Sequence, residues 1–371
     1  MIKYVCKQFI KMFTQQILLP VVYNRYRHTQ INTNKIIFAD AHHDSLPYSM
    51  EDVKNRLEQE GYEICLMCTD YQGHGALHVM RAMLSFMKHY ATAKGVFICD
   101  NFLPVASCNK RPETKVVQLW HAGGILKKYA YDTNDDIPAY YKGNVFKNYD
   151  YLPVSAPICI PVYNRAMRQP EGVVHATGLS RTDRFFKESY LEGCKKEFYA
   201  AYPDAKGKKI VLFAPTFRGK ASNPYVIGLD KIKQLEQELG DEWKVLIKVH
   251  PHMDAKTPTS NCTIPTERLL PVADVLIADY SSVIFDYVLL EKPMVLYAPD
   301  LEEYVKERGL YISYDEIPGR IVKEVDNLKD AVLEEYQNPP AQKLKDFKDK
   351  YMGSCDGNAT ERLLKELDFI K

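Results

Sequence analysis

The feature that most constrains this chain is a repeated alternation of short apolar runs with longer helical patterns. Residues 275–277 (Val-Leu-Ile) suit a buried parallel strand, residues 283–290 follow as a helix, and residues 294–297 form the next strand. Repeats of strand, helix and strand predict parallel sheets with helices on both faces. At 371 residues the chain is long for one domain, so we expect two doubly wound α/β domains.

The same alternation can be followed along most of the chain. The expected strands are residues 35–39, 62–68, 95–99, 115–119, 149–154, 173–177, 210–214, 244–249, 275–277 and 294–297. The expected helices are residues 49–61, 76–93, 157–167, a charged helix ending near 201, 229–239, 283–290, 302–308 and most of 323–371. These elements predict domains at residues 31–190 and 205–340, followed by C-terminal helices at residues 341–371.

Residues 1–30 differ from the rest because they carry basic residues and no acidic one. Lys3, Lys7 and Lys11 are spaced four apart and would line one face of a helix. Apolar residues would line the opposite face: Ile2, Val5, Phe9, Met12 and Phe13. This pattern favours an amphipathic helix lying in a membrane interface, and packing on the protein's own core is the alternative. The apolar run at residues 17–23 is too short to span a bilayer, which needs roughly 20 residues.

Polar residues follow several of the expected strands. In the first half, Gln118-Leu-Trp-His121-Ala-Gly-Gly124 comes at the end of a strand. Ligands of open α/β sheets bind at this edge, and glycines let a backbone approach a ligand closely. His121 is therefore a candidate catalytic residue, with Gly123 and Gly124 beside it, although a packed structural histidine is the alternative.

Three further strand ends in the second half carry polar residues. Thr216 and Arg218 follow one strand, and an arginine can hold a phosphate through two hydrogen bonds. His250 follows the next strand directly. Ser281 and Ser282 stand where a helix begins, which favours either a helix cap or a phosphate site. In that helix, Asp286 is a carboxylate that could hold ribose hydroxyls.

Several function classes lack their sequence signals. The net charge of +1 argues against a nucleic-acid partner held by bulk electrostatics. Neither a G-x-G-x-x-G fingerprint nor a Walker P-loop occurs, which weakens NAD and ATP interpretations. No carboxylate cluster has the spacing of a metal site. We therefore expect no cofactor and no metal, and a nucleotide bound by the second domain with an acceptor presented by the first.

The combined motifs resemble the CDP-glycerol glycerophosphotransferases of teichoic acid synthesis. The matching motifs are W-H-A-G-G, G-L-S-R-T-D, A-P-T-F-R, V-H-P, A-D-V-L-I-A-D-Y-S-S-V-I-F-D and E-K-P-M-V-L-Y-A-P-D. The resemblance implies a GT-B-like fold with two Rossmann-like domains facing a central cleft. It also implies transfer of glycerol phosphate from CDP-glycerol to a lipid-linked acceptor, with release of CMP.

The resemblance also implies roles for individual residues. His121 and His250 match the essential histidines of the W-H and H-P motifs, and we expect them to be catalytic. The expected donor-binding residues are Thr216, Arg218, Ser281, Ser282 and Asp286. Arg181 and Asp183 match the arginine and the aspartate of the family's loop at the G-L-S-R-T-D motif, on the acceptor side, in which Ser180 replaces the usual proline.

W-H-A-G-G is closer to the W-H-A-x-G of the primases than to the W-H-G-T-P of the polymerases. This subtype implies an undecaprenyl-diphosphate-linked disaccharide acceptor and a peripheral position on the cytoplasmic face of the membrane. A polymerase, a transferase of ribitol phosphate or capsule polyol phosphate, and a GT-B sugar-nucleotide glycosyltransferase or epimerase are the alternatives. A nucleotide-binding protein without activity is a further alternative.

A histidine can take the proton of an attacking hydroxyl near neutral pH. We expect His121 to be this base, because it comes from the domain expected to face the acceptor. His250 and Arg218 would then stabilise the diphosphate as CMP leaves. The roles of the two histidines could be exchanged.

Overall fold

The computed structural model describes residues 12–133, 136–137, 143–219, 225–249 and 259–371. Of the expected N-terminal helix, the three lysines and Ile2, Val5 and Phe9 therefore lie outside the described residues. His250 also lies outside them. Within the part of the chain that is described, no helix is both long and apolar enough to cross a bilayer.

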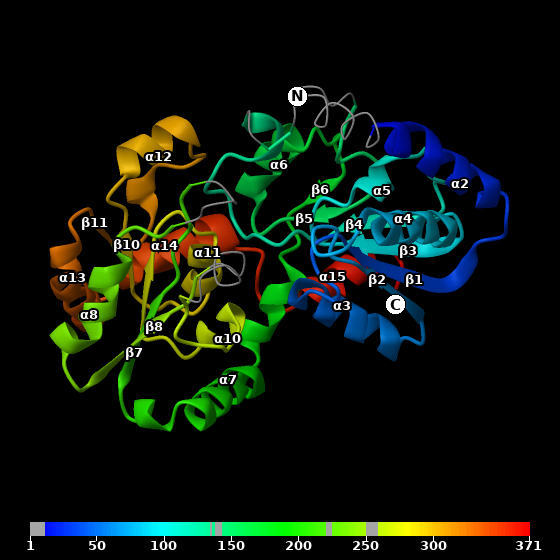
Figure 1. Ribbon diagram of the computed structural model, residues 1–371. Coiled ribbons are helices and arrows are strands. Elements are labelled where there is room, and N and C mark those ends of the chain that lie inside the picture. The colour runs from blue at the N-terminus through cyan, green and yellow to red at the C-terminus, as the bar shows by residue number, and fades with distance from the viewer. Residues whose placement is uncertain (1–11, 134–135, 138–142, 220–224, 250–258) are drawn as a thin grey trace. The chain divides into compact units, whose positions relative to one another are not determined.

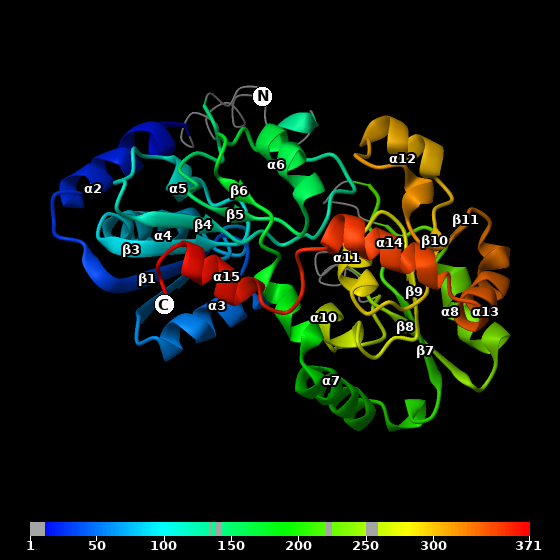
Figure 2. The same ribbon diagram turned by 180° about the vertical axis from the view of Figure 1, so that it is seen from behind.

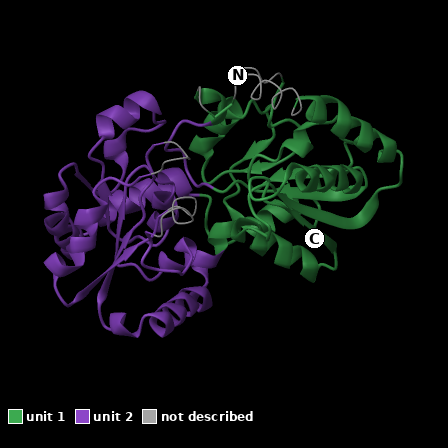
Figure 3. Ribbon diagram, in the orientation of Figure 1, with its two compact units in different colours: residues 1–121, 130–183, 354–371 green, residues 122–129, 184–353 purple. Residues whose placement is uncertain are grey.

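The chain divides into two compact units that exchange segments (Figure 3). The first unit comprises residues 1–121, 130–183 and 354–371, and the second comprises residues 122–129 and 184–353. The boundary between the units falls at residues 183 and 184, before the expected gap at residues 190–205, and residues 341–353 belong to the second unit. A short segment after His121 belongs to the second unit, and the last helix returns to the first.

The first unit is built on a parallel sheet with strand order β2-β1-β3-β4 (Figure 1). Its strands are β1 (Asn32–Asp40), β2 (Glu63–Cys68), β3 (Ala93–Ile98) and β4 (Lys115–Gln118). Two very short strands, β5 (Leu152–Pro153) and β6 (Val174–His175), form a second parallel pair. Tyr151, just before β5, bridges to Val117 of β4.

Helices cover both faces of this sheet (Figures 1 and 2). On one face, α3 and α15 enclose a core that includes Phe38 of β1 and Phe97 of β3. On the other face, α4 contributes buried Phe86, Met87 and Tyr90, and α2 packs on α4. The helices are α2 (Leu19–Tyr26), α3 (Tyr48–Gln59), α4 (Ala76–Tyr90), α5 (Leu103–Ala106), α6 (Ile160–Ala166) and α15 (Ala359–Glu366), with a π-helix η1 (Thr14–Leu18) before α2.

The second unit has a five-stranded parallel sheet with order β11-β10-β9-β7-β8. Its strands are β7 (Lys209–Phe213), β8 (Trp243–Ile247), β9 (Val275–Ala278), β10 (Met294–Tyr297) and β11 (Arg320–Val322). The first four lie close to their expected positions. The edge strand β11 is missing from the sequence-based prediction, because three residues are too few for a periodic pattern to appear.

Helices also cover both faces of the second sheet. On one face, α8 and α13 pack on a core of strand residues that includes Phe213 and Ile277. On the other, α11 packs on β9 and α14 packs on α11 (Figure 2). The helices are α7 (Glu188–Ala201), α8 (Leu229–Leu239), α10 (Thr266–Leu269), α11 (Val283–Val288), α12 (Leu301–Glu307), α13 (Leu328–Gln337) and α14 (Ala341–Met352).

Short 3₁₀ helices complete the described secondary structure. They are η2 (Ala130–Asp132), η3 (Pro157–Cys159), η4 (Ser180–Phe186), η5 (Pro203–Ala205), η6 (Tyr314–Glu316) and η7 (Val325–Asn327). The parallel sheets and the helices on their faces confirm the α/β class expected from the alternation of strands and helices.

Candidate active site

In the first unit, the carboxyl ends of β1, β3 and β4 bring histidines and carboxylates together. His121 follows β4, and its Nδ1 atom lies 3.4 Å from the Oδ2 atom of Asp100, which follows β3. The Nε2 atom of His42, which follows β1, lies 3.8 Å from the same oxygen. The side chain of His121 is 51% exposed, so its imidazole is open to a ligand.

The backbone beside His121 is held in an unusual conformation. Trp120 has a φ of 54°, in the left-handed region that non-glycine residues rarely adopt. Its ring is buried and its centroid lies 4.6 Å from that of His121. The two rings are tilted by 33° to one another, and the neighbouring indole therefore limits the rotation of the imidazole.

A buried amide, that of Gln118, stabilises this turn. Its Nε2 donates to the backbone carbonyl of Asp100 at 2.9 Å and to the hydroxyl of Tyr149 at 3.2 Å. Its Oε1 accepts the backbone N–H of Trp120 at 3.0 Å. One side chain thus joins the ends of β3 and β4, and it fixes the backbone on which Asp100 and His121 are mounted.

Sequence reasoning missed Asp100 and His42. Asp40-Ala-His-His-Asp44 directly follows the expected strand at residues 35–39, and this strand-end position was the available signal. Asp40 is 2% exposed, and its Oδ2 accepts the backbone N–H groups of His42 at 2.8 Å and His43 at 2.7 Å. Asp40 therefore shapes the turn that carries His42.

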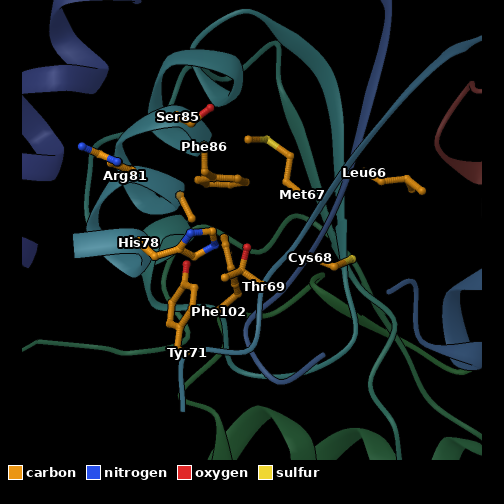
Figure 4. Close-up of a pocket in the computed structure, with 11 residues that line it drawn as sticks. Leu66, Met67, Cys68, Thr69, Tyr71, His78, Arg81, Ser85, Phe86 and Phe102 are labelled. Carbon is orange, nitrogen blue, oxygen red and sulfur yellow. The ribbon is translucent and has the colours of Figure 1, made fainter. Parts of the chain in front are cut away.

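A pocket of about 420 Å³ lies in the first unit between β2 and α4 (Figure 4). Phe86, Phe102 and Met67 give it an apolar lining, and His78 and Arg81 add basic groups. Two of its lining residues, Thr69 and Tyr71, donate backbone hydrogen bonds to the carbonyls of residues 40 and 41. The pocket therefore adjoins the loop that carries His42.

Gly123 and Gly124 bring the backbone against helix α11 within the second unit. Gly124 has a φ of 58°, and an added Cβ would lie 2.2 Å from the ring of Phe285. A Cβ on Gly123 would lie 3.3 Å from Phe285 and 3.4 Å from the Oδ1 of Asp286. Both positions need glycine because the backbone there lies close to other atoms. In this structure those atoms belong to helix α11.

In the second unit, Arg218 is almost fully engaged by neighbouring acceptors. Its Nε and Nη2 donate to the two carboxylate oxygens of Asp300 at 2.7 and 3.1 Å. Its Nη1 donates to Asp279 at 2.9 Å and to the carbonyl of Thr216 at 2.6 Å. The side chain is only 10% exposed, so the guanidinium binds the protein itself at the end of the sheet.

Aromatic rings and charges complete the surroundings of Arg218. Tyr280 and Tyr304 stack with their centroids 3.7 Å apart, and the guanidinium lies 4.9 and 5.1 Å from them. Burial favours the neutral form of Arg218, but its hydrogen bonds and ion pairs with Asp300 and Asp279 outweigh this and raise its pKa. Burial likewise raises the pKa of Asp300, but the bonds and charge of Arg218 dominate and hold it below its ordinary value.

The turn at residues 279–282 is anchored through Asp279. Its Oδ1 accepts the backbone N–H groups of Thr216 at 2.8 Å and Tyr280 at 2.6 Å. The Oγ of Ser281 accepts the N–H of Val283 at a long 3.4 Å, and Ser282 makes no side-chain cap bond to α11. Helix capping alone therefore gives a weak account of the two serines. Asp286 is 8% exposed in the first turn of α11.

The G-L-S-R-T-D loop holds the last helix of the chain. Asp183 is buried and accepts hydrogen bonds from the backbone N–H groups of Ala359 at 2.9 Å and Thr360 at 2.8 Å, and from the Thr360 hydroxyl at 2.7 Å. It caps the N-terminus of α15. Arg181 is also buried and donates to the hydroxyl of Tyr48 at 3.3 Å. These contacts give both residues a structural role within the first unit.

A family model described as CDP-Glycerol:Poly(glycerophosphate) glycerophosphotransferase matches residues 21–368. The chain belongs to this family. Its members include the enzymes that the sequence motifs resemble, so the resemblance is confirmed, and the chain is a transferase homologous to enzymes of teichoic acid synthesis.

Some relatives are named for ribitol phosphate and others for glycerol phosphate. A teichoic acid ribitol-phosphate primase of Bacillus spizizenii is 31% identical over 359 residues, covering 92% of this chain and 91% of that protein. A teichoic acid glycerol-phosphate primase of Bacillus subtilis is 32% identical over 287 residues, covering 72% of each. Polymerases also match, and the alignment with one ribitol-phosphate polymerase spans 59% of its length.

The solved structure of the wall teichoic acid polymerase TagF has a similar fold. It superposes with a TM-score of 0.73 at 20% identity, covering 98% of this chain and 96% of that one. At this identity the likeness shows the fold and leaves the reaction to be argued from the site.

Proposed function

We propose that this family member transfers glycerol phosphate from CDP-glycerol to a hydroxyl of an undecaprenyl-diphosphate-linked disaccharide, as a teichoic acid primase does. The observation that carries the proposal is the exposed imidazole of His121, with Asp100 at 3.4 Å, at the ligand-binding edge of a parallel sheet. A general base at such an edge suits attack by an acceptor hydroxyl.

In the proposed reaction, the acceptor oxygen attacks the phosphorus that bears glycerol. The bond from this phosphorus to the oxygen of CMP breaks, and the electron pair leaves with CMP. The hydroxyl proton passes to Nε2 of His121, because Nδ1 faces Asp100. The products are the glycerol phosphodiester and CMP.

We propose that the second unit holds the donor. The hydroxyls of Ser281 and Ser282 and the backbone of the turn would bind the diphosphate. Thr216 lies next to this turn through its bond to Asp279, and Asp286 would hold ribose hydroxyls. Arg218 supplies positive charge behind the turn and holds Asp279 in place. A diphosphate role for His250 remains a prediction, as does the GT-B-like arrangement of two domains around a cleft.

The acceptor and the membrane are assigned to the first unit. Phe13, Ile17 and Val21 are spaced four apart and are 48%, 51% and 61% exposed, so they form an apolar stripe on the N-terminal helical segment. We propose that this stripe contacts the cytoplasmic face of the membrane. The pocket between β2 and α4, with Arg81 on its wall, offers space for part of a lipid-linked anion.

Ribitol phosphate is the second candidate for the transferred group, since the ribitol-phosphate primase matches across most of both chains. The test uses purified protein, a synthetic lipid-linked disaccharide, and CDP-glycerol or CDP-ribitol in parallel. Mass spectrometry of the product identifies the polyol, and one added unit marks a primase while a ladder marks a polymerase. Release of UDP from a sugar nucleotide, with no CMP from either donor, would instead indicate a glycosyltransferase or epimerase.

A further inference from the structure

Asp100 is the charged group that the structure places against the inner nitrogen of His121. Its Oδ2 lies 3.4 Å from Nδ1 of His121 and 3.8 Å from Nε2 of His42. The two histidines come from the ends of β4 and β1, and Asp100 comes from the end of β3 between them. One carboxylate oxygen therefore faces two imidazoles.

The position of Asp100 is fixed independently of the histidines. Its Oδ1 accepts the backbone N–H of Asn101 at 2.6 Å, which leaves Oδ2 facing the rings. Its backbone carbonyl accepts a hydrogen bond from Nε2 of the buried Gln118 side chain. Oε1 of the same side chain accepts a hydrogen bond from the backbone N–H of Trp120. The Gln118 side chain therefore joins the backbone of Asp100 to the backbone of Trp120, next to His121, and fixes the Asp100 carboxylate and the His121 imidazole relative to one another.

We propose that Asp100 is a positioning residue that keeps the proton of neutral His121 on Nδ1, so that Nε2 is free to take the acceptor proton. A neutral imidazole carries one N–H, and its partner decides which nitrogen bears it. A carboxylate only accepts hydrogen bonds, so it selects the Nδ1–H tautomer. This inference rests on the proposed function for its catalytic consequence, and on geometry alone for the tautomer.

His42 shares the oxygen of Asp100 but has a different setting. Its backbone N–H is held by Asp40, and among the described residues no ring lies against it as the tilted ring of Trp120 lies against His121. In the described part of the first unit, the titratable groups near the Asp100 carboxylate include His121, His42, Cys99 and Tyr149. Burial raises the pKa of the Cys99 thiol and of the Tyr149 hydroxyl, so both are neutral and the two histidines are the groups that can carry charge. We assign the positioning role toward His121, because the shorter distance and the Gln118 frame both join Asp100 to that residue.

The test compares Asp100→Asn and Asp100→Ala with Asp44→Asn in the full-length protein. Asp44 pairs with His74 at 2.8 Å at the same sheet edge, and it is a matched histidine–carboxylate pair away from His121. With CDP-glycerol and the lipid-linked disaccharide, both Asp100 variants should lower kcat at least about tenfold with little change in KM. Asp44→Asn should stay within about threefold of the wild type.

The second readout is independent of activity. In protein labelled with ¹⁵N-histidine at about pH 9, where free imidazole is neutral, the His121 signals are identified by their loss in His121→Gln. The wild type should show the Nδ1–H pattern, and Asp100→Asn should move it toward Nε2–H, because an amide can also donate. Thermal melting checks that each variant is folded.

The outcomes separate this inference from the proposed function. If neither CDP-glycerol nor CDP-ribitol gives product with the wild type, the proposed function fails, while the tautomer measurement still decides the role of Asp100. An unchanged His121 tautomer in both Asp100 variants would overturn the inference, even if the enzyme is an active transferase. Equal losses of kcat in Asp100→Asn and His42→Gln with an unchanged His121 tautomer would show that Asp100 acts through His42, which also overturns it.

Discussion

The carboxyl edges of the two sheets handle charge in opposite ways. In the second unit, Arg218 is 10% exposed and donates four hydrogen bonds to Asp300, Asp279 and Thr216. In the first unit, His121 is 51% exposed and faces Asp100 at 3.4 Å. A saturated, buried cation stabilises a rigid turn, whereas an open imidazole with one partner can exchange a proton. The comparison separates a residue that stabilises a turn, Arg218, from the residue that we propose as the base, His121.

The largest expected effect is on activity. His121→Ala should lower transfer by ~10²–10⁴-fold, because it removes the proposed general base. Its stability should stay within about 0.5 kcal/mol of the wild type, since the side chain is exposed. CMP release and urea unfolding, measured on the same samples, test both parts. Retention of more than about a tenth of wild-type transfer would remove His121 from the base role.

The next effect is on stability. Arg218→Ala should lower the free energy of unfolding by about 3–5 kcal/mol, because buried Asp279 and partly buried Asp300 lose their counter-charge. Urea unfolding at neutral pH measures this loss. Lys231→Ala removes an ion pair with Asp326 in the same unit whose side chains are both exposed, so it is the control and should change stability little. If Arg218→Ala were no more destabilising than His121→Ala, the contrast between the two edges would not hold.

Gln118→Leu tests the frame beneath the exposed histidine. The substitution keeps the size of the side chain but leaves the Asp100 carbonyl and the Trp120 N–H without their partner. We expect a loss of about 2–4 kcal/mol, since each buried unsatisfied group costs ~1–3 kcal/mol. Thermal unfolding and tryptophan fluorescence measure the loss and the release of Trp120. If the variant were as stable as the wild type, the turn at Trp120 and His121 would not depend on the Gln118 amide.

The stability difference between Asp300→Asn and the wild type should depend on pH. The folded pKa of Asp300 lies below its ordinary value near 3.8, so the stability from its pair with Arg218 is present above that value and is lost as pH falls through the folded value. We expect the variant to be about 1.5–3 kcal/mol less stable at pH 7. Urea unfolding should show this gap narrowing below about pH 4. A gap that is constant with pH would exclude the carboxylate charge as its source.

The smallest effect on stability is expected for Ser281→Ala. The bond from the Val283 N–H to Ser281 Oγ is 3.4 Å long, so its loss should cost less than about 0.5 kcal/mol. The KM for CDP-glycerol should rise if the hydroxyl binds the diphosphate. Normal KM together with a loss of more than about 1 kcal/mol would identify Ser281 as a helix cap instead.

The central strands of both sheets could be predicted because they are buried on two faces. Runs such as residues 275–278 and 294–297 are apolar throughout, and glycine or proline ends the helices between them. Strand β11 could not be predicted, because three residues on a sheet edge carry no periodicity. The exchange of residues 122–129 and 354–371 between the units could not be predicted either, since local sequence does not show which core a segment will join.

The candidate site was predictable only in part. His121 and the turn at residues 279–282 follow strands directly, so their place at a sheet edge could be inferred. The Asp100 partner was not found, because the order of strands decides which strand ends are neighbours. The engagement of Arg218 was not found either, since Asp300 is distant in sequence and its pairing depends on packing.

The capping of α15 by Asp183 has a consequence for how the protein is made. Leu363, Leu364 and Phe369 complete the core that includes Phe38 and Phe97, so the first sheet is closed by the end of the chain. While the ribosome is still adding the second unit, α3 is in place on that face of the sheet but α15 is not. The core of the first sheet can therefore be completed only after residues 359–369 have left the ribosome.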